Sequence, residues 1–441
     1  MNDDIRDAIL IGGGHNGLVC AAYLARAGLK VTVLERRDVV GGAAVTEEFH
    51  PGFRNSVAAY TVSLLQPKVI ADLNLAAHGL KIVQRKLNNF LPRPDGTYLK
   101  TGAGQTQAEV AKFSQRDAQR LPEYERRLDV IADVLRVLAL EPPPNVTDSG
   151  WWKGLAELLR AGKLGKRLHG LDANSRTELL DLFAISAGEY LDRFFESEPI
   201  KAVLGFDGIV GNYASPYTPG SAYVLLHHVF GEVNGVKGAW GHAIGGMGAI
   251  TQAMAKSAAA SGVEIRTGAG VREVIVEKGR AVGVITEKGE TLRARAVVAN
   301  VNPKLLYERL LDPGVVPAPT RERMANWRCG SGTFRMNVAL STLPRFTVLP
   351  EPGDHHTAGI IMAPSLDYMD RAYLDARAQG WSKEPIVEML IPSTLDDSLA
   401  PKGQHVASLF CQHVAPTLSD GRSWDDHRDE VADLMIATVD R

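Results

Sequence analysis

The chain has 441 residues, of which 45% are hydrophobic and 23% are charged, and its formal net charge is −2. This length exceeds one ordinary domain, so we expect two or three interleaved globular lobes. The near-neutral charge gives no global basic field for nucleic acid, and no apolar run is long enough to span a membrane. The acidic start, MNDDIRD, and three widely separated cysteines predict a cytoplasmic location, or the mitochondrial matrix in a eukaryote.

The first 35 residues predict a βαβ unit. An apolar run at 7–11 ends at glycines, as a buried parallel strand does. Small and apolar residues then recur with helical spacing up to Gly28, and residues 29–34 form a second, β-branched strand. We therefore expect a dinucleotide-binding fold that starts almost at residue 1.

Between the first strand and the helix lies the sequence GGGHNG, whose glycines have separable roles. Gly12 permits a tight turn, Gly14 lets the backbone approach a pyrophosphate, and Gly17 lets helix and strand pack closely. The helix would begin around His15 and Asn16, where free N–H groups favour a phosphate. His15 could donate a proton there, but a loop residue packed on neighbouring backbone is the interpretation that we favour.

The residues after the second strand distinguish the cofactors. Glu35 stands where a carboxylate accepts hydrogen bonds from an adenosine ribose, a contact that suits either FAD or NAD. Arg36 or Arg37 could meet an NADP 2′-phosphate, but that interpretation leaves the pair Gly41-Gly42 unexplained. A glycine doublet permits close backbone approach to a bulkier ligand, such as a ribityl chain and a flavin edge. The sequence therefore favours FAD.

The remaining chain predicts an α/β fold, α+β overall, in which a Rossmann-like FAD-binding domain is discontinuous and carries an inserted, mixed substrate domain. Helical and polar patterns, a Gly-rich stretch and a β-rich stretch alternate along it. The expected boundaries are FAD-binding domain at 1–66, largely helical substrate or lid domain at 67–240, FAD-binding domain at 241–303, substrate domain at 304–405, and a helical segment leading back toward the FAD-binding domain at 406–441.

Several motifs together resemble the flavin amine oxidase and phytoene desaturase superfamily. The order E-x-R-x-x-x-G-G at 35–42 is typical of it. The stretches GHNGLVCAAYL, GGAAVTEE, SPYTPGSAYVLLHHVFGEVNGVKGAWG and GGMGAITQAM are similar to its carotenoid oxidoreductase branch, over essentially the whole chain. The resemblance implies FAD, an apolar and isoprenoid-like substrate, and contacts to the cofactor from Val271, whose backbone would hold the adenine, and from Asn300.

The chain departs from this pattern in two places. Many relatives carry arginine after the glycine doublet, where Ala43 stands, so that charged contact near the flavin is missing. The family also continues into a glycine-rich C-terminal segment that lines the flavin, and nothing after Gly245-Gly246 resembles it. These departures keep open a flavin-fold regulatory or interaction protein with weak or no turnover.

Other chemistry is less well supported. Without a close cysteine pair or a second dinucleotide loop, we expect neither disulfide reduction nor an NAD(P)H domain. Adjacent histidines, such as His355-His356, point apart on regular elements, so no metal is expected. We assign no catalytic residue. Substrate-lining candidates come from the Gly-rich stretch and the start of the helix after it: Asp207, Tyr213, Tyr223, His227, Gly246 and Met247.

Residues 151–171 combine five Lys or Arg with two tryptophans and several leucines. This composition suits a helix in a membrane interface through which a lipid-like substrate enters. A lid helix that packs its Trp and Leu face inward is the alternative, which we slightly favour.

The sequence as a whole predicts an FAD-dependent oxidoreductase that abstracts a hydride from a C–H bond of an apolar small molecule. The electrons taken from the substrate would pass to dioxygen, a quinone or a partner. Carotenoid ketolation or desaturation is a second enzymatic alternative. A protein partner or a homo-oligomer is left open.

Overall fold

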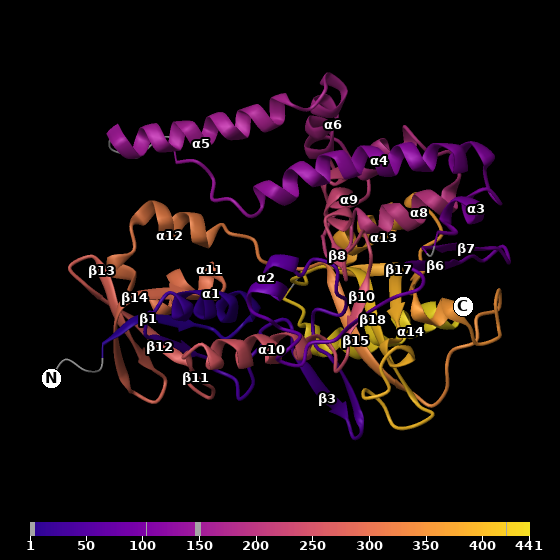
Figure 1. The fold of residues 1–441 in the computed structure, drawn as a ribbon. Helices are drawn as coiled ribbons and strands as arrows, with labels where there is room; N and C mark the ends of the chain where they lie inside the picture. The colour runs from indigo at the N-terminus through magenta and orange to yellow at the C-terminus, as the bar shows by residue number, and fades with distance from the viewer. Residues whose placement is uncertain (1–4, 103, 146–150, 420) are drawn as a thin grey trace.

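The computed structural model describes residues 5–102, 104–145, 151–419 and 421–441. Two six-stranded sheets lie side by side, and a helical lobe covers the upper side of the molecule (Figure 1). The chain crosses between these parts several times, so each of them is assembled from distant segments.

The first sheet is built as the sequence predicts. Strand β1 (Arg6–Ile11) pairs in parallel with β2 (Val31–Leu34) and, on its other side, with β14 (Thr291–Ala299) from far along the chain. The order of the sheet is β11 (Glu264–Arg266), β2, β1, β14, β13 (Arg280–Thr286) and β12 (Val271–Glu277). The last three form the expected antiparallel meander, with turns at Lys278-Gly279 and Lys288-Gly289.

Two helices with small-residue faces cover one side of this sheet. Helix α1 (His15–Arg26) and helix α10 (Met247–Ala260) pack on each other through buried alanines, together with Leu18 and Met254. Helix α2 (Pro67–Asp72) joins the same apolar cluster. The other side packs against the segment that holds α11 (Pro303–Leu305), a following π-helical turn and α12 (Ala318–Ala325).

The second sheet is mostly antiparallel and has one helical lobe on one face and a single long helix on the other. Helix α14 (Trp424–Asp440) packs on one face through Val431 and Met435. Helix α13 (Leu366–Gln379) and the lobe pack on the other. The strand order is β15 (Thr333–Leu340), β18 (His405–Val414), β17 (Trp381–Leu390), β16 (Gly359–Met362), β6 (Asn89–Pro92) and β7 (Tyr98–Thr101).

Three two-stranded antiparallel sheets complete the structure. Two are hairpins, β3 (Thr46–His50) with β4 (Phe53–Ser56) and β8 (Glu232–Val233) with β9 (Val236–Lys237), and the third pairs β5 (Ile82–Gln84) with β10 (Gly241–Ala243) from a distant part of the chain. The helical lobe is formed by α3 (Thr106–Val110), α4 (Gln115–Leu138), α5 (Trp151–His169), α6 (Ala173–Ala184), α7 (Ala187–Asp192), α8 (Glu198–Asp207) and α9 (Ala222–Val229). Helix α5 projects from the top of this lobe over the first-sheet half (Figure 1). Among the described residues, no helix is both long and apolar enough to cross a membrane.

One expectation for secondary structure is wrong. The interval 406–441 does not run as a helix toward the first sheet, because residues 405–414 form β18 in the second sheet. The sequence HVASLFCQHV is buried along both faces and therefore lacks the alternation that marks a strand. The interval 67–240 is largely helical, as expected, and also contains the short strands β5, β6 and β7, which are only three or four residues long.

Candidate functional site

The glycine loop turns sharply between β1 and α1. Gly12 has a φ of 97°, and a Cβ placed on it would lie 2.6 Å from the carbonyl oxygen of Asn300. A Cβ on Gly17 would lie 2.5 Å from the carbonyl oxygen of Gly12. Asn300 Nδ2 donates to that same oxygen at 3.2 Å. Both glycines are therefore required by backbone packing, as the sequence predicts, and Asn300 braces the turn.

The N-terminus of α1 opens directly from this loop. Its N-cap is Gly14, which has no side chain to satisfy the first N–H groups, and no acidic residue stands in the first turn. His15 and Asn16, the first two residues of the helix, are exposed. A helix end without a side-chain cap is suited to an anion such as a phosphate.

Glu35 links the loop to the end of the second strand. Its carboxylate accepts the Gly13 N–H at 2.8 Å and the Arg37 N–H at 2.9 Å, and its side chain is nearly buried. A carboxylate has further lone pairs, so these bonds leave acceptors for two ribose hydroxyls. The backbone oxygen of Glu35 accepts the N–H of Ala269, two residues before Val271. The predicted adenosine contacts therefore lie beside one another.

The pair Gly41-Gly42 lies directly against the glycine loop. Gly41 N–H donates to the Gly13 oxygen at 2.9 Å, and a Cβ on Gly42 would lie 3.1 Å from Gly14 Cα. Gly42 has a φ of 60° and, like Ala43, is exposed. The pair thus forms an open shelf beside the α1 N-terminus.

The two arginines before the shelf do not share one environment. Arg37 pairs with Glu47 on the β3 hairpin, whereas Arg36 is exposed. Neither observation favours a 2′-phosphate contact over the ribose contact of Glu35. The uncapped helix end, the acidic ribose partner and the open glycine shelf together fit FAD, for which Gly12, Gly14, Gly17, Glu35, Gly41 and Gly42 would form the cradle.

Ser56 joins the shelf to α10 and to the second sheet. Its hydroxyl accepts the Met247 N–H at 3.0 Å, and its carbonyl accepts hydrogen bonds from Arg335 and Asn337 on β15. The adjacent segment returns to the shelf, because Ala59 N–H donates to the Ala43 oxygen at 3.0 Å. This segment therefore lies where the two sheets meet.

A buried carboxylate fixes the turn that precedes α10. Asp396 Oδ2 lies 3.0 Å from His242 Nε2 and accepts the Gly245 N–H at 2.6 Å, while its other oxygen accepts two hydrogen bonds from Ser398. Burial opposes ionisation of Asp396, but these hydrogen bonds outweigh it and hold its pKa well below the usual value. Gly246, with a φ of 77°, and Met247 come directly after this turn and lie against the β3 hairpin.

The other predicted substrate residues are dispersed over the helical lobe. Asp207 ends α8, and burial raises its pKa to about 8. Tyr213 packs on the rings of Tyr373 and His413, and Tyr223 stacks on Phe183. His227 lies in α9, but its side chain is outside the described residues. Asp207, Tyr213 and Tyr223 have different neighbours, and the contact of all four residues with substrate stays a prediction.

Sequence reasoning missed a polar row on the second sheet. Arg335, Phe410 and Glu388 are cross-strand neighbours on β15, β18 and β17, so their side chains share one face. Tyr60 donates to Glu388 Oε2 at 2.6 Å and lies under the Arg335 guanidinium, 4.7 Å from its ring centroid. Burial raises the pKa of Tyr60 well above its usual value, and the Glu388 charge adds to the effect. No local motif marks residues this far apart.

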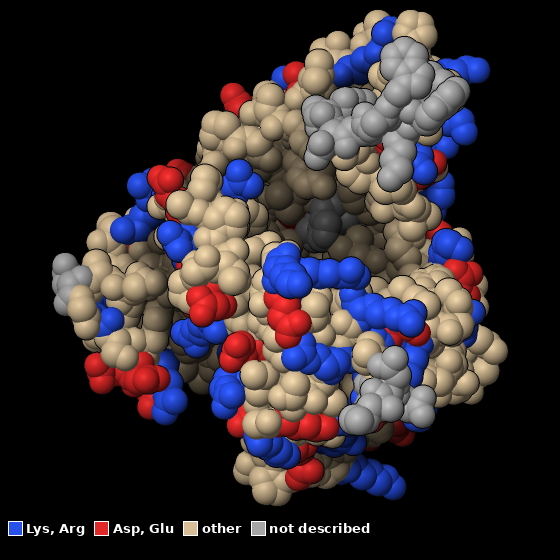
Figure 2. All heavy atoms as spheres, turned by 90° about the vertical axis from the view of Figure 1, so that its left-hand side faces the viewer, with Lys and Arg blue, Asp and Glu red and all other residues tan. Residues whose placement is uncertain are grey.

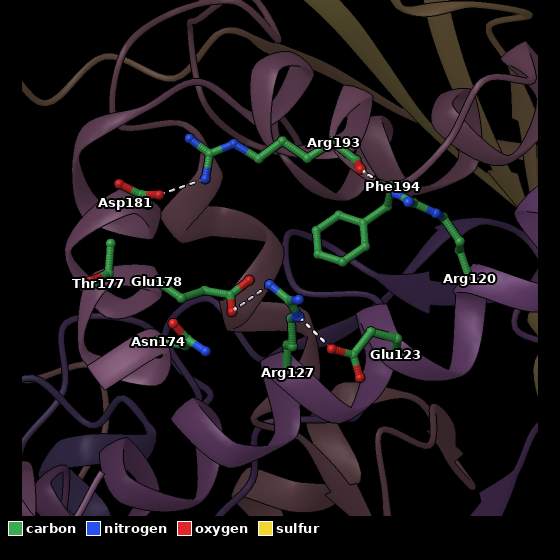
Figure 3. Close-up of a pocket in the computed structure, with 9 residues that line it drawn as sticks. All are labelled: Arg120, Glu123, Arg127, Asn174, Thr177, Glu178, Asp181, Arg193 and Phe194. Atoms are coloured by element: carbon green, nitrogen blue, oxygen red, sulfur yellow. Dashed lines mark hydrogen bonds and ion pairs between the residues drawn. The ribbon is translucent and has the colours of Figure 1, made fainter. Parts of the chain in front are cut away.

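The face of the molecule seen in Figure 2 is deeply hollowed at its centre, between the helical lobe above and the first-sheet half below. A second cleft lies within the lobe, between α4 and α6 (Figure 3). There Arg127 bridges Glu123 and Glu178 at 2.7 and 3.3 Å and lies over the Phe194 ring. Its charges are paired with one another, which is typical of a structural network.

The pair His355-His356 lies beside the second sheet's aromatic cluster. The two rings are tilted against each other with centroids 4.0 Å apart, and His356 Nε2 lies 2.8 Å from the Pro344 oxygen. Over the described part of the chain, no group of three or more His, Cys, Asp or Glu side chains is placed to hold an ion.

Comparison with known proteins identifies the family. The model of the family described as flavin containing amine oxidoreductase matches residues 17–366. The chain belongs to this family. It is also 39% identical to the rat protein named pyridine nucleotide-disulfide oxidoreductase domain-containing protein 2, across 98% of this chain and 78% of that protein. This family of FAD-dependent oxidoreductases is the one that the sequence motifs predict.

Two more distant similarities extend the family assignment. A phytoene desaturase (neurosporene-forming) from Cereibacter sphaeroides is 27% identical over 91% of this chain and 71% of its own length. The crystal structure of an oxidoreductase from Methanosarcina mazei matches with a TM-score of 0.61 and 16% identity, over 98% of this chain and 83% of that one. The second match supports the predicted fold, a Rossmann-like sheet combined with a substrate sheet.

Proposed function

We propose that this flavin-containing amine oxidoreductase homologue binds FAD and oxidises a C–H bond of a largely apolar small molecule. The observation that carries the proposal is the contact between the two glycine segments, with Gly42 against Gly14 beside an uncapped helix end and the Glu35 carboxylate. The related phytoene desaturase, whose name describes an isoprenoid substrate, supports the apolar part of the proposal.

Each part of the cradle would have its own task. The backbone N–H groups at the start of α1 would hold the pyrophosphate, and Glu35 would accept the ribose hydroxyls. The shelf at Gly41-Gly42 would admit the ribityl chain, because no side chain intervenes there. When bound, the flavin supplies the hydride acceptor, while the protein orients the substrate and excludes water. Dioxygen, a quinone or a protein partner would then take the electrons.

The visible spectrum of the purified chain tests this proposal. We expect a flavin absorption band after incubation with FAD, reversible bleaching by a chemical reductant, and recovery of the band with dioxygen or a quinone. Apolar alcohols, amines and isoprenoids can then be screened for anaerobic bleaching. A chain that remains colourless with excess FAD would contradict the proposal and favour the non-catalytic alternative.

Glu35→Gln is a sharper probe of the same site. Glutamine retains one acceptor oxygen but offers an N–H₂ group to Gly13 N–H or Arg37 N–H, both of which donate in the native protein. We expect FAD to bind about 10- to 100-fold more weakly, because charge-assisted hydrogen bonds contribute about 1.5–3 kcal/mol each. A fluorescence-quenching titration measures the change, and Glu232→Gln, on the distant β8, is the matched control.

We also propose that α5 brings this substrate from a membrane surface. Leu158 and Leu159 are 60% and 65% exposed, so this part of the helix does not pack inward as the lid alternative requires. Arg160, Lys163 and Lys166 lie further along the same helix, whose Trp151 and Trp152 side chains lie outside the described residues. Exposed leucines beside basic residues suit an anionic bilayer.

Liposome flotation tests the role of α5. We expect the wild-type chain to float with anionic vesicles and Leu158→Ser/Leu159→Ser to lose at least about half of that binding, since burial of each leucine would contribute roughly 1.5–3 kcal/mol. Leu374→Ser, at a leucine on α13 that is 52% exposed, is the control. Equal flotation of all three proteins would exclude this surface.

A further inference from the structure

The second sheet presents an unusual set of unsatisfied polar atoms where it faces the first-sheet half. Among the described residues, seven buried side-chain nitrogen or oxygen atoms have no hydrogen-bond partner, and three of them lie close together on two paired strands. These are Thr333 Oγ1, Arg335 Nη1 and Ser408 Oγ. Their register on β15 and β18 places all three on the same face as Phe410.

This face contacts both the first-sheet side of the molecule and the helical lobe. Phe410 lies 5.2 Å from the Tyr60 ring on the first-sheet side, and a Cβ on Gly211 of the helical lobe would lie 3.9 Å from it. Its neighbour Gln412 accepts the Gly211 N–H and donates to the Ile209 oxygen. The row is thus bordered by the segment that reaches the glycine shelf and by the lobe that covers the sheet.

Arg335 is held rigidly on this face. Its Nε donates to the Val57 oxygen at 3.1 Å and its Nη2 to the Ser56 oxygen at 3.2 Å, while the Tyr60 ring supports the guanidinium plane. Only Nη1 lacks an acceptor, although it is shielded from solvent. A buried guanidinium N–H without a partner is costly, so a fixed and unsatisfied donor indicates an acceptor that is not part of the chain.

The surrounding charge favours an anion. Arg85 is buried nearby, and burial lowers the pKa of both Arg85 and Arg335, whereas Glu388 acts on both in the opposite direction. Two cations therefore share one carboxylate, which is itself engaged by Tyr60. A planar, oriented Arg donor is the group that proteins use for carboxylates, and the hydroxyls of Thr333 and Ser408 add donors on the same face.

We propose that Arg335 binds the carboxylate head of an apolar acid, which makes the substrate a fatty-acid-like or isoprenoid acid rather than a pure hydrocarbon. The apolar stem would extend along Phe410 and Val57, the second of which is 40% exposed. The assignment of this molecule as substrate rests on the proposed function, whereas its binding does not require the flavin.

Three probes of equal chain length test the proposal: octanoate, octan-1-ol and octylamine. Each is titrated by calorimetry into the chain as purified and into the chain loaded with FAD. We expect octanoate to bind at least about 10-fold more tightly than either other probe, and Arg335→Met to remove that preference. Arg335→Lys should retain part of it, because a cation remains. Arg428→Met, on α14 at the opposite face of the sheet, should change nothing.

The proposal of FAD binding and the proposal of a carboxylate site at Arg335 can be overturned separately. Absence of FAD binding with a retained, Arg335-dependent preference for octanoate would overturn only the flavin chemistry. Equal binding of the three probes in both forms, or a preference that survives Arg335→Met in a folded protein, would overturn the carboxylate site. If Arg335→Met weakens FAD binding and leaves octanoate binding unchanged, Nη1 serves a flavin carbonyl and the proposal is wrong.

Discussion

Gly17→Ala is expected to weaken FAD binding by at least about 100-fold. The added Cβ would lie 2.5 Å from the Gly12 carbonyl oxygen and 2.7 Å from Asn300 Nδ2, well inside normal contact distance. Neither of these two contacted groups can move easily, because Gly12 follows β1 directly and the backbone of Asn300 is hydrogen-bonded to Ile11. The start of α1 must therefore shift away from the turn. A 100-fold loss corresponds to about 2.7 kcal/mol, within the range for overpacked sites.

The measurement is a titration of the flavin-free protein with FAD, followed by absorbance and by quenching of flavin fluorescence. Circular dichroism confirms that the variant is folded. Gly165→Ala is the matched control, since a Cβ there meets no atom within 4 Å and lies in the distant helix α5. A folded Gly17→Ala protein that binds FAD within about threefold of wild type would show that the loop does not hold the pyrophosphate.

The glycine loop could be predicted because its physics is local. Gly12, Gly17 and Glu35 lie within 24 positions, and the strand–turn–helix order alone dictates where each must stand. The structure adds a partner that no local spacing reveals, Asn300, which follows the neighbouring strand β14 at the same edge of the sheet and is 288 positions from Gly12. Only the family resemblance predicts Asn300 as a cofactor contact, since the residues near it in the sequence give no such indication.

The polar row on the second sheet could not be predicted in this way. Tyr60 and Glu388 are 328 positions apart, and His242 and Asp396 are 154 apart, so their meeting depends on how two sheets and several crossings assemble. Nor does local pattern reveal β18, since its residues are buried on both faces and show no alternation. Cross-strand register, which local pattern does not specify, is what places Arg335 opposite Phe410.

His413 gives a large expected dependence of stability on pH in the acid range. Its ring is fully buried between Tyr213 and Tyr373, and burial lowers its pKa to about 3. In the unfolded chain a histidine titrates near about 6.5. Below that pH the unfolded state takes up a proton that the folded state does not, so the free energy of unfolding falls as pH drops. The loss begins near pH 6.5 and ends near the folded pKa, at about 1.4 kcal/mol per pH unit.

His413→Phe should remove this contribution while keeping a ring against both tyrosines. The ring Nε2 has no hydrogen-bond partner, so the replacement gives up little at that atom. Denaturant titrations measure the free energy of unfolding at pH 7 and at pH 5. Between these two values, His413 should lower it by about 2 kcal/mol in the wild type, and the variant should lack this contribution. Burial also lowers the pKa of His355, to about 4, and raises the pKa of Asp207, to about 8. The variant therefore keeps a slope of the same sign from His355 and one of opposite sign from Asp207. The control His169→Gln, at an exposed position, should keep the full wild-type difference. If His413→Phe keeps it as well, the buried ring does not govern acid stability.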